Sequence, residues 1–177
     1  MTRIRPGRLP EIGPVAWALA RGGGRLAGTE PMNLFLVLGR HRRLFHGWLH
    51  FAARLMPFGQ LPRRDSELVI LRVAHLRGSR YETAQHERIG KRAGLTDAEL
   101  ARVRTGASAD GWTPRQRALL AAVDELLATR DLGDETWSVL RAHLDERAAI
   151  EFVLLAGHYD MLAAAIAALR IRPEVRR

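Results

Sequence analysis

The sequence predicts an all-α fold: a compact multi-helix array built around a central helical hairpin. Apolar residues recur at helical spacing along most of the 177 residues, and no stretch shows the alternating pattern of a half-buried strand. Nothing repeats at a fixed interval, which argues against a solenoid. The length fits a single domain whose core is large enough to fold without disulfide bonds.

Residues 1–30 are predicted to form an N-terminal extension with a glycine-rich connector, ahead of a helical domain over residues 31–177. A short helix is expected over residues 15–20, and the four glycines of residues 21–30 are typical of a flexible segment. The apolar run near the start is short and is broken by Pro10 and Pro14, unlike a secretory signal. We therefore expect no export signal.

The next segment is predicted to form a short helix up to Gly39 and a longer helix that ends before Pro57. It carries His41, His46 and His50, whose role the sequence does not decide. His46 and His50 are four residues apart, a spacing that could hold a metal, but no third ligand lies nearby. An isolated pair of this kind fits an exposed or aromatic-packed helix face better, so no metal site is predicted.

The central hairpin is expected over residues 61–95, as two helices joined at Gly78. The first helix should begin at Pro62, because proline suits the first turn of a helix, and should stop at Gly78. It is apolar almost all round. Glu67 lies on the same stripe as Leu71, so its carboxylate should point toward the core.

The second helix of the hairpin places Glu82 and His86 on its apolar face, at a hundred degrees per residue. If the two helices fold back about Gly78, His86 comes level with Glu67. Such a cluster is either a satisfied structural network or a functional site with shifted pKa values, because buried charge is costly unless it is paired. Ser79 and Glu82 also fit a capping box, in which case Glu82 is only a helix cap and His86 only a core histidine.

Three segments of this region resemble a known family: ELVILRVA (67–74), SRYETAQH (79–86) and GLTDAEL (94–100). They are similar to the carboxymuconolactone decarboxylase family, which includes the alkylhydroperoxidase D-like proteins. The resemblance extends more loosely from Asn33 to about Leu169. It implies a compact helical array in which the functional face of the hairpin often meets another subunit, so we expect a homo-oligomer, a dimer, trimer or hexamer.

The resemblance also implies which site residues are kept and which are lost. In the peroxidase branch, a glutamate at the position of Glu67 and a histidine at that of His86 serve a Cys-x-x-Cys pair, which would fall at Ser79 and Glu82. This chain has no cysteine, which excludes disulfides, thiol catalysis and cysteine–zinc sites. Thr83 also departs from the bulky residue, often tryptophan, of the decarboxylase-like branch.

The function implied is non-redox acid–base chemistry without a cofactor, a decarboxylation or a related lyase or isomerase reaction on a small anionic organic substrate. His86 would transfer the proton, because histidine titrates near neutral pH, while Glu67 and Glu82 would orient it or relay protons. Tyr81 could donate to an oxyanion, and arginines could hold a substrate carboxylate or equally form surface pairs. The substrate-binding candidates are Tyr81, Ser79, Arg72 and Arg77.

Two alternatives remain at this stage. One is a non-catalytic oligomeric binding or scaffold protein that has kept the fold after losing the cysteine pair. The other is alkylhydroperoxidase-type peroxidase activity, which is disfavoured because it needs a redox centre that the chain lacks.

The remaining elements are all expected to be helical. Thr96 and Glu99 form a capping box that opens a short helix, and helices should follow over residues 113–130 and 133–143. The stretch 145–169 is apolar and long enough to raise the question of a membrane span.

Ionisable residues within this last helix argue against a membrane span, because charge at the bilayer centre is expensive. They are Glu151, His158 and Asp160. Glu151 and His158 share a helix face, and we expect them to form a second polar contact, structural or between subunits, because nothing in the sequence places them beside Glu67.

The composition is strongly basic, with 28 Lys and Arg against 19 Asp and Glu, a net charge of +9. The arginines are scattered through every segment, whereas proteins that bind a nucleic-acid backbone gather cations on one face. We expect no specific nucleic-acid partner and no membrane partner. The lack of cysteine and of an export signal fits a cytoplasmic protein that acts on a small molecule.

Overall fold

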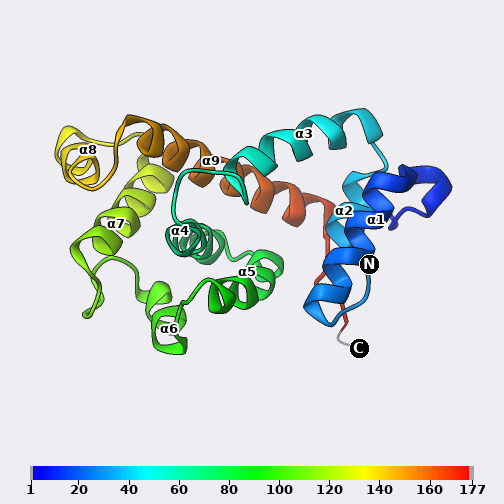
Figure 1. Ribbon diagram of the computed structural model, residues 1–177, viewed down its shortest axis with the longest axis horizontal. Helices are drawn as coiled ribbons and strands as arrows, with labels where there is room; N and C mark the ends of the chain where they lie inside the picture. The colour runs from blue at the N-terminus through cyan, green and yellow to red at the C-terminus, as the bar shows by residue number, and fades with distance from the viewer. Residues whose placement is uncertain (1, 176–177) are drawn as a thin grey trace. The chain divides into compact units, whose positions relative to one another are not determined.

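The computed structural model describes residues 2–175. Over that range the chain forms nine helices and no β-strand, which confirms the all-α prediction (Figure 1). The helices are α1 (Leu9–Ala27), α2 (Asn33–Leu38), α3 (Arg42–Leu55), α4 (Arg63–Leu76), α5 (Arg80–Arg92), α6 (Asp97–Thr105), α7 (Pro114–Thr129), α8 (Asp134–Arg141) and α9 (Glu146–Leu169).

The chain divides into two compact units. One consists of the residues before Arg54 together with those after Ala163, and the other of Arg54–Ala163. All candidate site residues lie in the second unit. The division into an extension of residues 1–30 and a domain of residues 31–177 stays a prediction.

In the first unit, helix α1 runs to Ala27, so the expected short helix over residues 15–20 and flexible connector after it are wrong in extent. Two of its glycines, Gly23 and Gly24, allow close packing. A Cβ at Gly24 would lie 2.3 Å from the carbonyl oxygen of Glu30, so only glycine fits there. The helix is interrupted only at Gly13, whose φ of 78° leaves the helical region just before Pro14.

In the second unit, the predicted hairpin is confirmed. Helix α4 starts directly after Pro62, and α5 starts directly after Ser79. Gly78 turns the chain between them with a φ of 61°, a left-handed conformation that glycine adopts without steric cost. The start of each hairpin helix and the turn between them are therefore set by proline, serine and glycine residues that the sequence shows.

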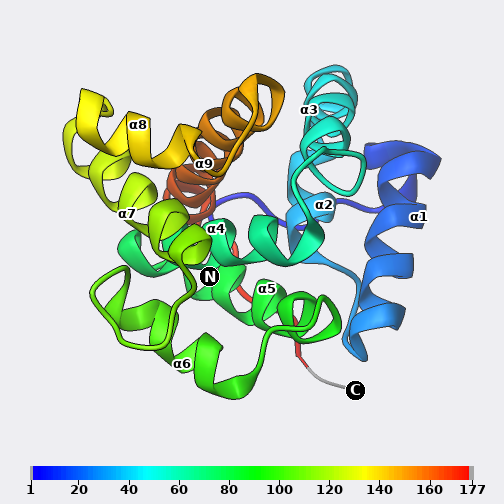
Figure 2. The same ribbon diagram turned by 60° about the vertical axis from the view of Figure 1, so that its left-hand side comes forward.

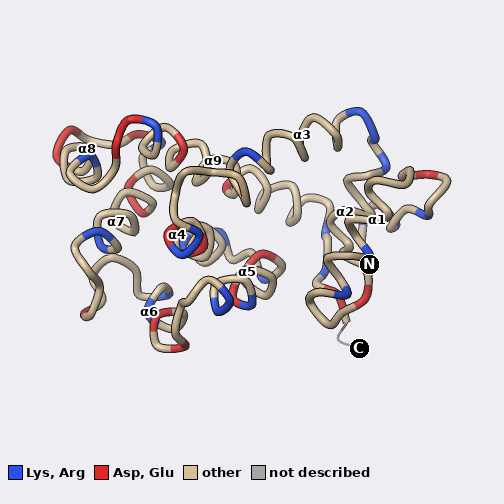
Figure 3. Tube along the Cα trace, in the orientation of Figure 1, with Lys and Arg blue, Asp and Glu red and all other residues tan. Residues whose placement is uncertain are grey.

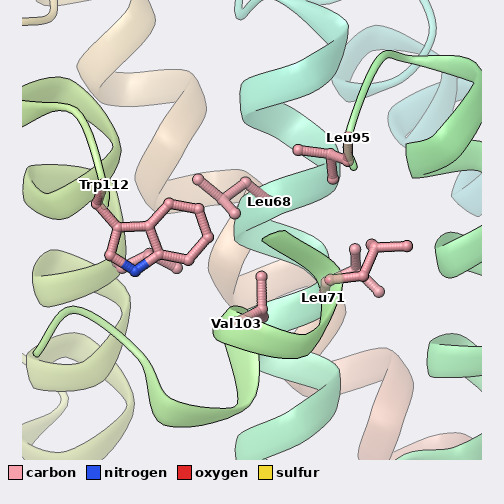
Figure 4. Close-up of a cluster of buried hydrophobic side chains, with 7 residues drawn as sticks. Leu68, Leu71, Leu95, Val103 and Trp112 are labelled. Atoms are coloured by element: carbon pink, nitrogen blue, oxygen red, sulfur yellow. The ribbon is translucent and has the colours of Figure 1, made fainter. Parts of the chain in front are cut away.

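Helix α4 is the centre of this unit, since every residue from Asp65 to Ala74 is buried. Helices α5, α6 and α7 pack against it (Figure 2). On one side, Leu68 and Leu71 meet the side chains of Val103 and Trp112 in a buried apolar cluster (Figure 4). This packing holds α4 rigidly enough to carry buried polar groups on its other faces.

The capping box predicted at Thr96 is confirmed. The Thr96 hydroxyl accepts the backbone N–H of Glu99 at 3.2 Å, and the Glu99 carboxylate accepts the backbone N–H of Thr96 at 2.9 Å. An equivalent box between Thr113 and Gln116 opens α7. Both helices thus begin where their sequence signals place them.

Helix α9 is, within the described residues, the one helix long and apolar enough to cross a membrane. A core helix of a soluble protein passes the same test. In this structure its ionisable residues have protein partners: Glu151 accepts the backbone N–H groups of Gln60 and Leu61 at 2.6 and 3.0 Å, and Asp160 pairs with Arg77 and Arg130. The absence of a membrane partner stays a prediction.

Figure 3 shows basic residues along the whole trace, with acidic residues among them everywhere except over residues 31–64, which carry arginines alone. Many of them form ion pairs within the chain, such as Arg64 with Glu99 and Arg115 with Asp65. A scattered arrangement of this kind is typical of solvated protein surface. The expectation of no specific nucleic-acid partner stays a prediction.

Candidate functional site

The candidate site is built on a direct contact between the two hairpin helices. His86 of α5 places its Nδ1 2.7 Å from the Oε2 atom of Glu67 on α4. The prediction that folding about Gly78 brings these residues level is confirmed. The Glu67 side chain is fully buried, whereas the His86 side chain keeps 9% of its surface exposed.

Arg63 completes the surroundings of Glu67. Its Nε lies 3.1 Å from Oε1, the other carboxylate oxygen, one helical turn before Glu67 on α4. The carboxylate is therefore held between a guanidinium and an imidazole, which offsets the cost of its burial. Because Nδ1 of His86 is engaged by Glu67, Nε2 is the ring nitrogen left to exchange a proton. Arg63 was not among the site residues predicted from the sequence.

Glu82 is the second buried carboxylate of the site, with 2% of its surface exposed. Neither of its oxygens has a hydrogen-bond partner of ordinary geometry in the described part of the chain. Burial raises the pKa of Glu82 to about 7, with Asp160 adding to the rise and the nearby Ser79 hydroxyl opposing it. At neutral pH this carboxyl group is thus poised between its two protonation states.

The capping box expected at Ser79 is not formed. Ser79 stands at the N-cap position of α5, but its side chain makes no capping hydrogen bond. The backbone N–H of Ser79, which a capping Glu82 would accept, is instead donated to the carbonyl oxygen of Ala74 at 2.8 Å. Glu82 is therefore not a helix cap.

Tyr159 of α9 covers the imidazole of His86. The two rings meet edge to face, with centroids 5.1 Å apart and an angle of 87°. Burial raises the pKa of Tyr159 well above 10, and the nearby carboxylates of Glu67 and Glu82 raise it further, so the phenol keeps its proton. Tyr159 was missed by the sequence analysis because only the packing of α9 brings it to the hairpin.

His158 also joins the surroundings of this site. Its ring lies edge to face with Tyr159 at 5.3 Å, and burial lowers its pKa to about 4. His158 is therefore a neutral imidazole at neutral pH. The contact is with the next residue of α9, so the expected structural or inter-subunit role of Glu151 and His158 stays a prediction.

The two arginines proposed as substrate ligands are engaged elsewhere. Arg72 donates from Nε to Asp124 at 2.5 Å and from Nη1 to the carbonyl oxygens of Val103 and Arg104, at 2.9 and 2.8 Å. Arg77 pairs with Asp160 and donates to the carbonyl oxygen of Leu127. Their role in substrate binding stays a prediction, and these contacts do not support it.

Of the other proposed ligands, Tyr81 and Ser79 are both buried at the start of α5.

Among the described residues there is no group of three or more His, Cys, Asp or Glu side chains that could hold a metal ion. His46 and His50 are exposed on α3, where the His46 ring contacts Phe45. The titratable side chains that the structure brings into direct contact at this site are those of Glu67 and His86.

The fold is that of the alkylhydroperoxidase AhpD-like all-α proteins. An uncharacterized peroxidase-related protein from Ralstonia eutropha JMP134, described as an alkylhydroperoxidase AhpD core, superposes with a TM-score of 0.83 at 18% identity, over 97% of this chain and 92% of that one. The debrominase Bmp8 superposes with a TM-score of 0.80 at 18% identity, over 97% and 91%. A peroxidase-related protein from Silicibacter sp. TM1040 gives 0.74 at 16% identity, over 81% and 77%.

The central part of the sequence also matches a family model. Residues 42–125, which include Glu67, Glu82 and His86, match the model of the Carboxymuconolactone decarboxylase family. This central region, which holds the three motif segments and has no cysteine, is therefore similar to the family, as those segments indicated. No curated protein matches the chain.

Proposed function

We propose that this protein catalyses a non-redox acid–base reaction, a decarboxylation or a related lyase or isomerase reaction, on a small anionic organic substrate. The observation that carries the proposal is the buried contact of 2.7 Å between Glu67 and His86, with a second carboxyl group, Glu82, close to half-protonated at neutral pH. Pairs of titratable groups with divergent environments are typical of acid–base sites.

In a decarboxylation, the bond between the carboxylate carbon and the neighbouring carbon breaks, and carbon dioxide leaves. The electron pair of that bond stays on the neighbouring carbon and is delocalised toward a carbonyl group. A proton must then be delivered to that carbon. In our proposal His86 donates this proton from Nε2, while Glu67 holds the ring through Nδ1 and stabilises the imidazolium. Glu82 serves as the reservoir from which the histidine is reprotonated, because its pKa of about 7 allows both directions of transfer.

The similar structures support an enzyme fold without fixing the reaction. One of them is a debrominase and two are peroxidase-related proteins, so proteins of this fold already differ in function. A thiol peroxidase reaction in this chain would need the cysteine pair, and the chain has no cysteine. The acid–base residues are what the chain retains of the family pattern.

The test is an assay of carbon dioxide release from a panel of carboxylated lactones and β-keto acids. Turnover by the wild type should fall by about 10²–10⁴-fold in His86→Ala, the usual contribution of a general acid or base. Glu67→Gln should lose activity as well, because it removes the carboxylate that holds the imidazole. Each variant must retain the wild-type circular dichroism spectrum.

Two matched variants serve as controls. His50→Ala and Glu135→Gln change the same residue types at exposed positions on α3 and α8, and both should keep full activity. Equal turnover in His86→Ala and the wild type would overturn the proposed role of His86. A panel without any turnover, combined with unchanged assembly of His86→Ala, would favour the scaffold alternative.

We also propose, on the family resemblance, that the protein is a cytoplasmic homo-oligomer. Light scattering of the purified protein tests the assembly directly. A monomer at micromolar concentration would contradict it.

A further inference from the structure

A surface hollow of about 290 Å³ lies against the hairpin, apart from the acid–base cluster. It is bounded by the end of α4, the turn at Gly78, the first turns of α5 and the end of α6. None of its lining residues is Glu67, Glu82 or His86. It is therefore a separate feature of this chain that the proposed reaction does not use.

The floor of the hollow is made of small residues. Ala74, Gly78 and Ala84 line it, and a Cβ added at Gly78 would meet no atom within 4 Å. The volume equals that of roughly ten water molecules at about 30 Å³ each. Thr83 also lines it, with its hydroxyl donated to the carbonyl oxygen of Ser79. The space suits a small molecule with a short apolar body.

The rim of the hollow is basic. Arg80 and Arg104 both line it, against a single carboxylate, that of Glu87. The side chain of Arg80 makes no ion pair with a described residue, and Arg104 approaches Glu87 only at 3.7 Å. Two guanidinium groups thus border a concave surface with little internal neutralisation, in a chain whose net charge is +9.

His75 reports on the electrostatic potential in this hollow. Its pKa is lowered by burial first, then by Arg104 and by the neighbouring Arg72, while Glu87 opposes the shift. Positive potential therefore dominates at the imidazole. An anion placed between Arg80 and Arg104 would relieve it.

We propose that this hollow binds a small organic carboxylate with a short apolar body. The carboxylate would accept hydrogen bonds from Arg80 and Arg104, since guanidinium groups match carboxylate geometry, and the apolar body would cover Ala74 and Ala84. The proposal does not rest on the proposed function, because the two sites share no residue.

Benzoate is the probe for the test, and the imidazole of His75 is the reporter. In an NMR titration, benzoate should shift the His75 ring resonances saturably and should raise the pKa of His75, because the bound carboxylate offsets Arg104 and Arg72. Benzyl alcohol, which has a similar apolar body without charge, should bind much more weakly. Inorganic phosphate should bind more weakly than benzoate, since it cannot use the apolar floor.

Substitutions then locate the binding. Arg80→Ala and Arg104→Ala should each weaken benzoate binding by about tenfold, the loss of one charge-assisted hydrogen bond. Thr83→Trp should abolish binding by filling the hollow. Arg147→Ala, an exposed arginine at the start of α9, is the matched control for charge, and His86→Ala is the control for the acid–base site; both should bind benzoate as the wild type does.

Several results would overturn the proposal: no saturable benzoate binding, equal binding of benzyl alcohol, or unchanged affinity in the double variant Arg80→Ala with Arg104→Ala. The two arginines are exposed, so these variants should fold even if Thr83→Trp does not. Loss of binding in His86→Ala alone would move the ligand to the acid–base cluster and would also contradict the proposal.

Discussion

Two of the buried charged side chains of helix α4, Arg72 and Glu67, have surroundings that differ in one respect. Arg72, on one face, has a carboxylate and two carbonyl oxygens as acceptors for its guanidinium. Glu67, on another face, belongs to a cluster in which the second carboxylate, Glu82, has no ordinary hydrogen-bond partner among the described residues. Both side chains are buried, Glu67 completely and Arg72 with 8% of its surface exposed.

This difference in hydrogen bonding distinguishes a structural role for Arg72 from a functional role for the Glu67 cluster. A buried charge with a full set of partners stabilises one arrangement of the chain, and breaking it leaves orphaned groups. A buried acid without partners costs stability, and it is retained where its shifted pKa has a use. The contacts of Arg72 therefore stabilise the packing of α4 against α6 and α7, and the region around Glu67 is the candidate functional site.

Removing the guanidinium of Arg72 should have the largest effect on stability. Arg72→Met should lower the free energy of unfolding by about 3–5 kcal/mol, because it strands Asp124 and two carbonyl oxygens that have no other partner of equal quality. Denaturant unfolding measures this, with Arg147→Met as an exposed control. A loss below about 1 kcal/mol is typical of a surface ion pair. It would contradict the structural role assigned to Arg72.

Glu82 should show the opposite behaviour, as a residue that weakens the fold when it ionises. Its pKa is raised from 4.5 to about 7, so between these values the unfolded chain has released a proton that the folded chain keeps. Stability should therefore fall as pH rises from 4.5 to 7, by about 3 kcal/mol at about 1.4 kcal/mol per pKa unit. Glu82→Gln should remove this loss.

The measurement is unfolding by urea at a series of pH values for the wild type and for Glu82→Gln. The variant should gain stability relative to the wild type by up to about 3 kcal/mol between pH 4.5 and pH 7, with no further gain above. Glu135→Gln, exposed on α8, should show no such gain. A difference that does not vary with pH would mean that Glu82 is not buried in its acid form.

His158 should give a pH dependence of similar size and opposite sign. Its pKa is lowered from 6.5 to about 4, so between these values the unfolded chain binds a proton that the folded chain does not. Its contribution to stability is complete above pH 6.5 and is lost as pH falls toward 4, about 3 kcal/mol in all. His158→Gln should abolish this acid-induced loss in the same urea series, whereas an unchanged slope would place the histidine in solvent.

The hairpin and its pairing were predictable because they depend on local signals. Pro62 and Gly78 fix where α4 starts and where the chain turns, and equal distance from the turn brings His86 to Glu67. Helical periodicity already assigned both side chains to buried faces. Nothing beyond thirty residues of sequence was needed.

Tyr159 and His158 were not predictable in the same way, since their place depends on how α9 docks. Helix α9 is apolar nearly all round, so its sequence does not show which face meets the hairpin. The extent of α1 was missed for a related reason, because glycines that pack closely in the structure look flexible in the sequence. Tertiary packing overrode local propensity in both places.

Thr96 and Ser79 begin their helices with the same sequence pattern but differ in hydrogen bonding. The expected difference in stability between their variants is the smallest of those predicted. The Thr96 hydroxyl accepts the backbone N–H of Glu99, whereas the buried hydroxyl of Ser79 has no hydrogen-bond partner of ordinary geometry in the described chain. Thr96→Ala should therefore cost about 1 kcal/mol of unfolding free energy, and Ser79→Ala should cost much less.

Ser79→Ala should instead change the titration of Glu82, because the Ser79 hydroxyl lowers the pKa of that carboxyl group. Without it the pKa should rise further, and the window in which stability falls with pH should extend upward. The urea series at several pH values measures both quantities in one experiment. If Ser79→Ala costs as much as Thr96→Ala and leaves the pH dependence unchanged, Ser79 is a cap after all, and Glu82 belongs with the satisfied groups of the Arg72 region.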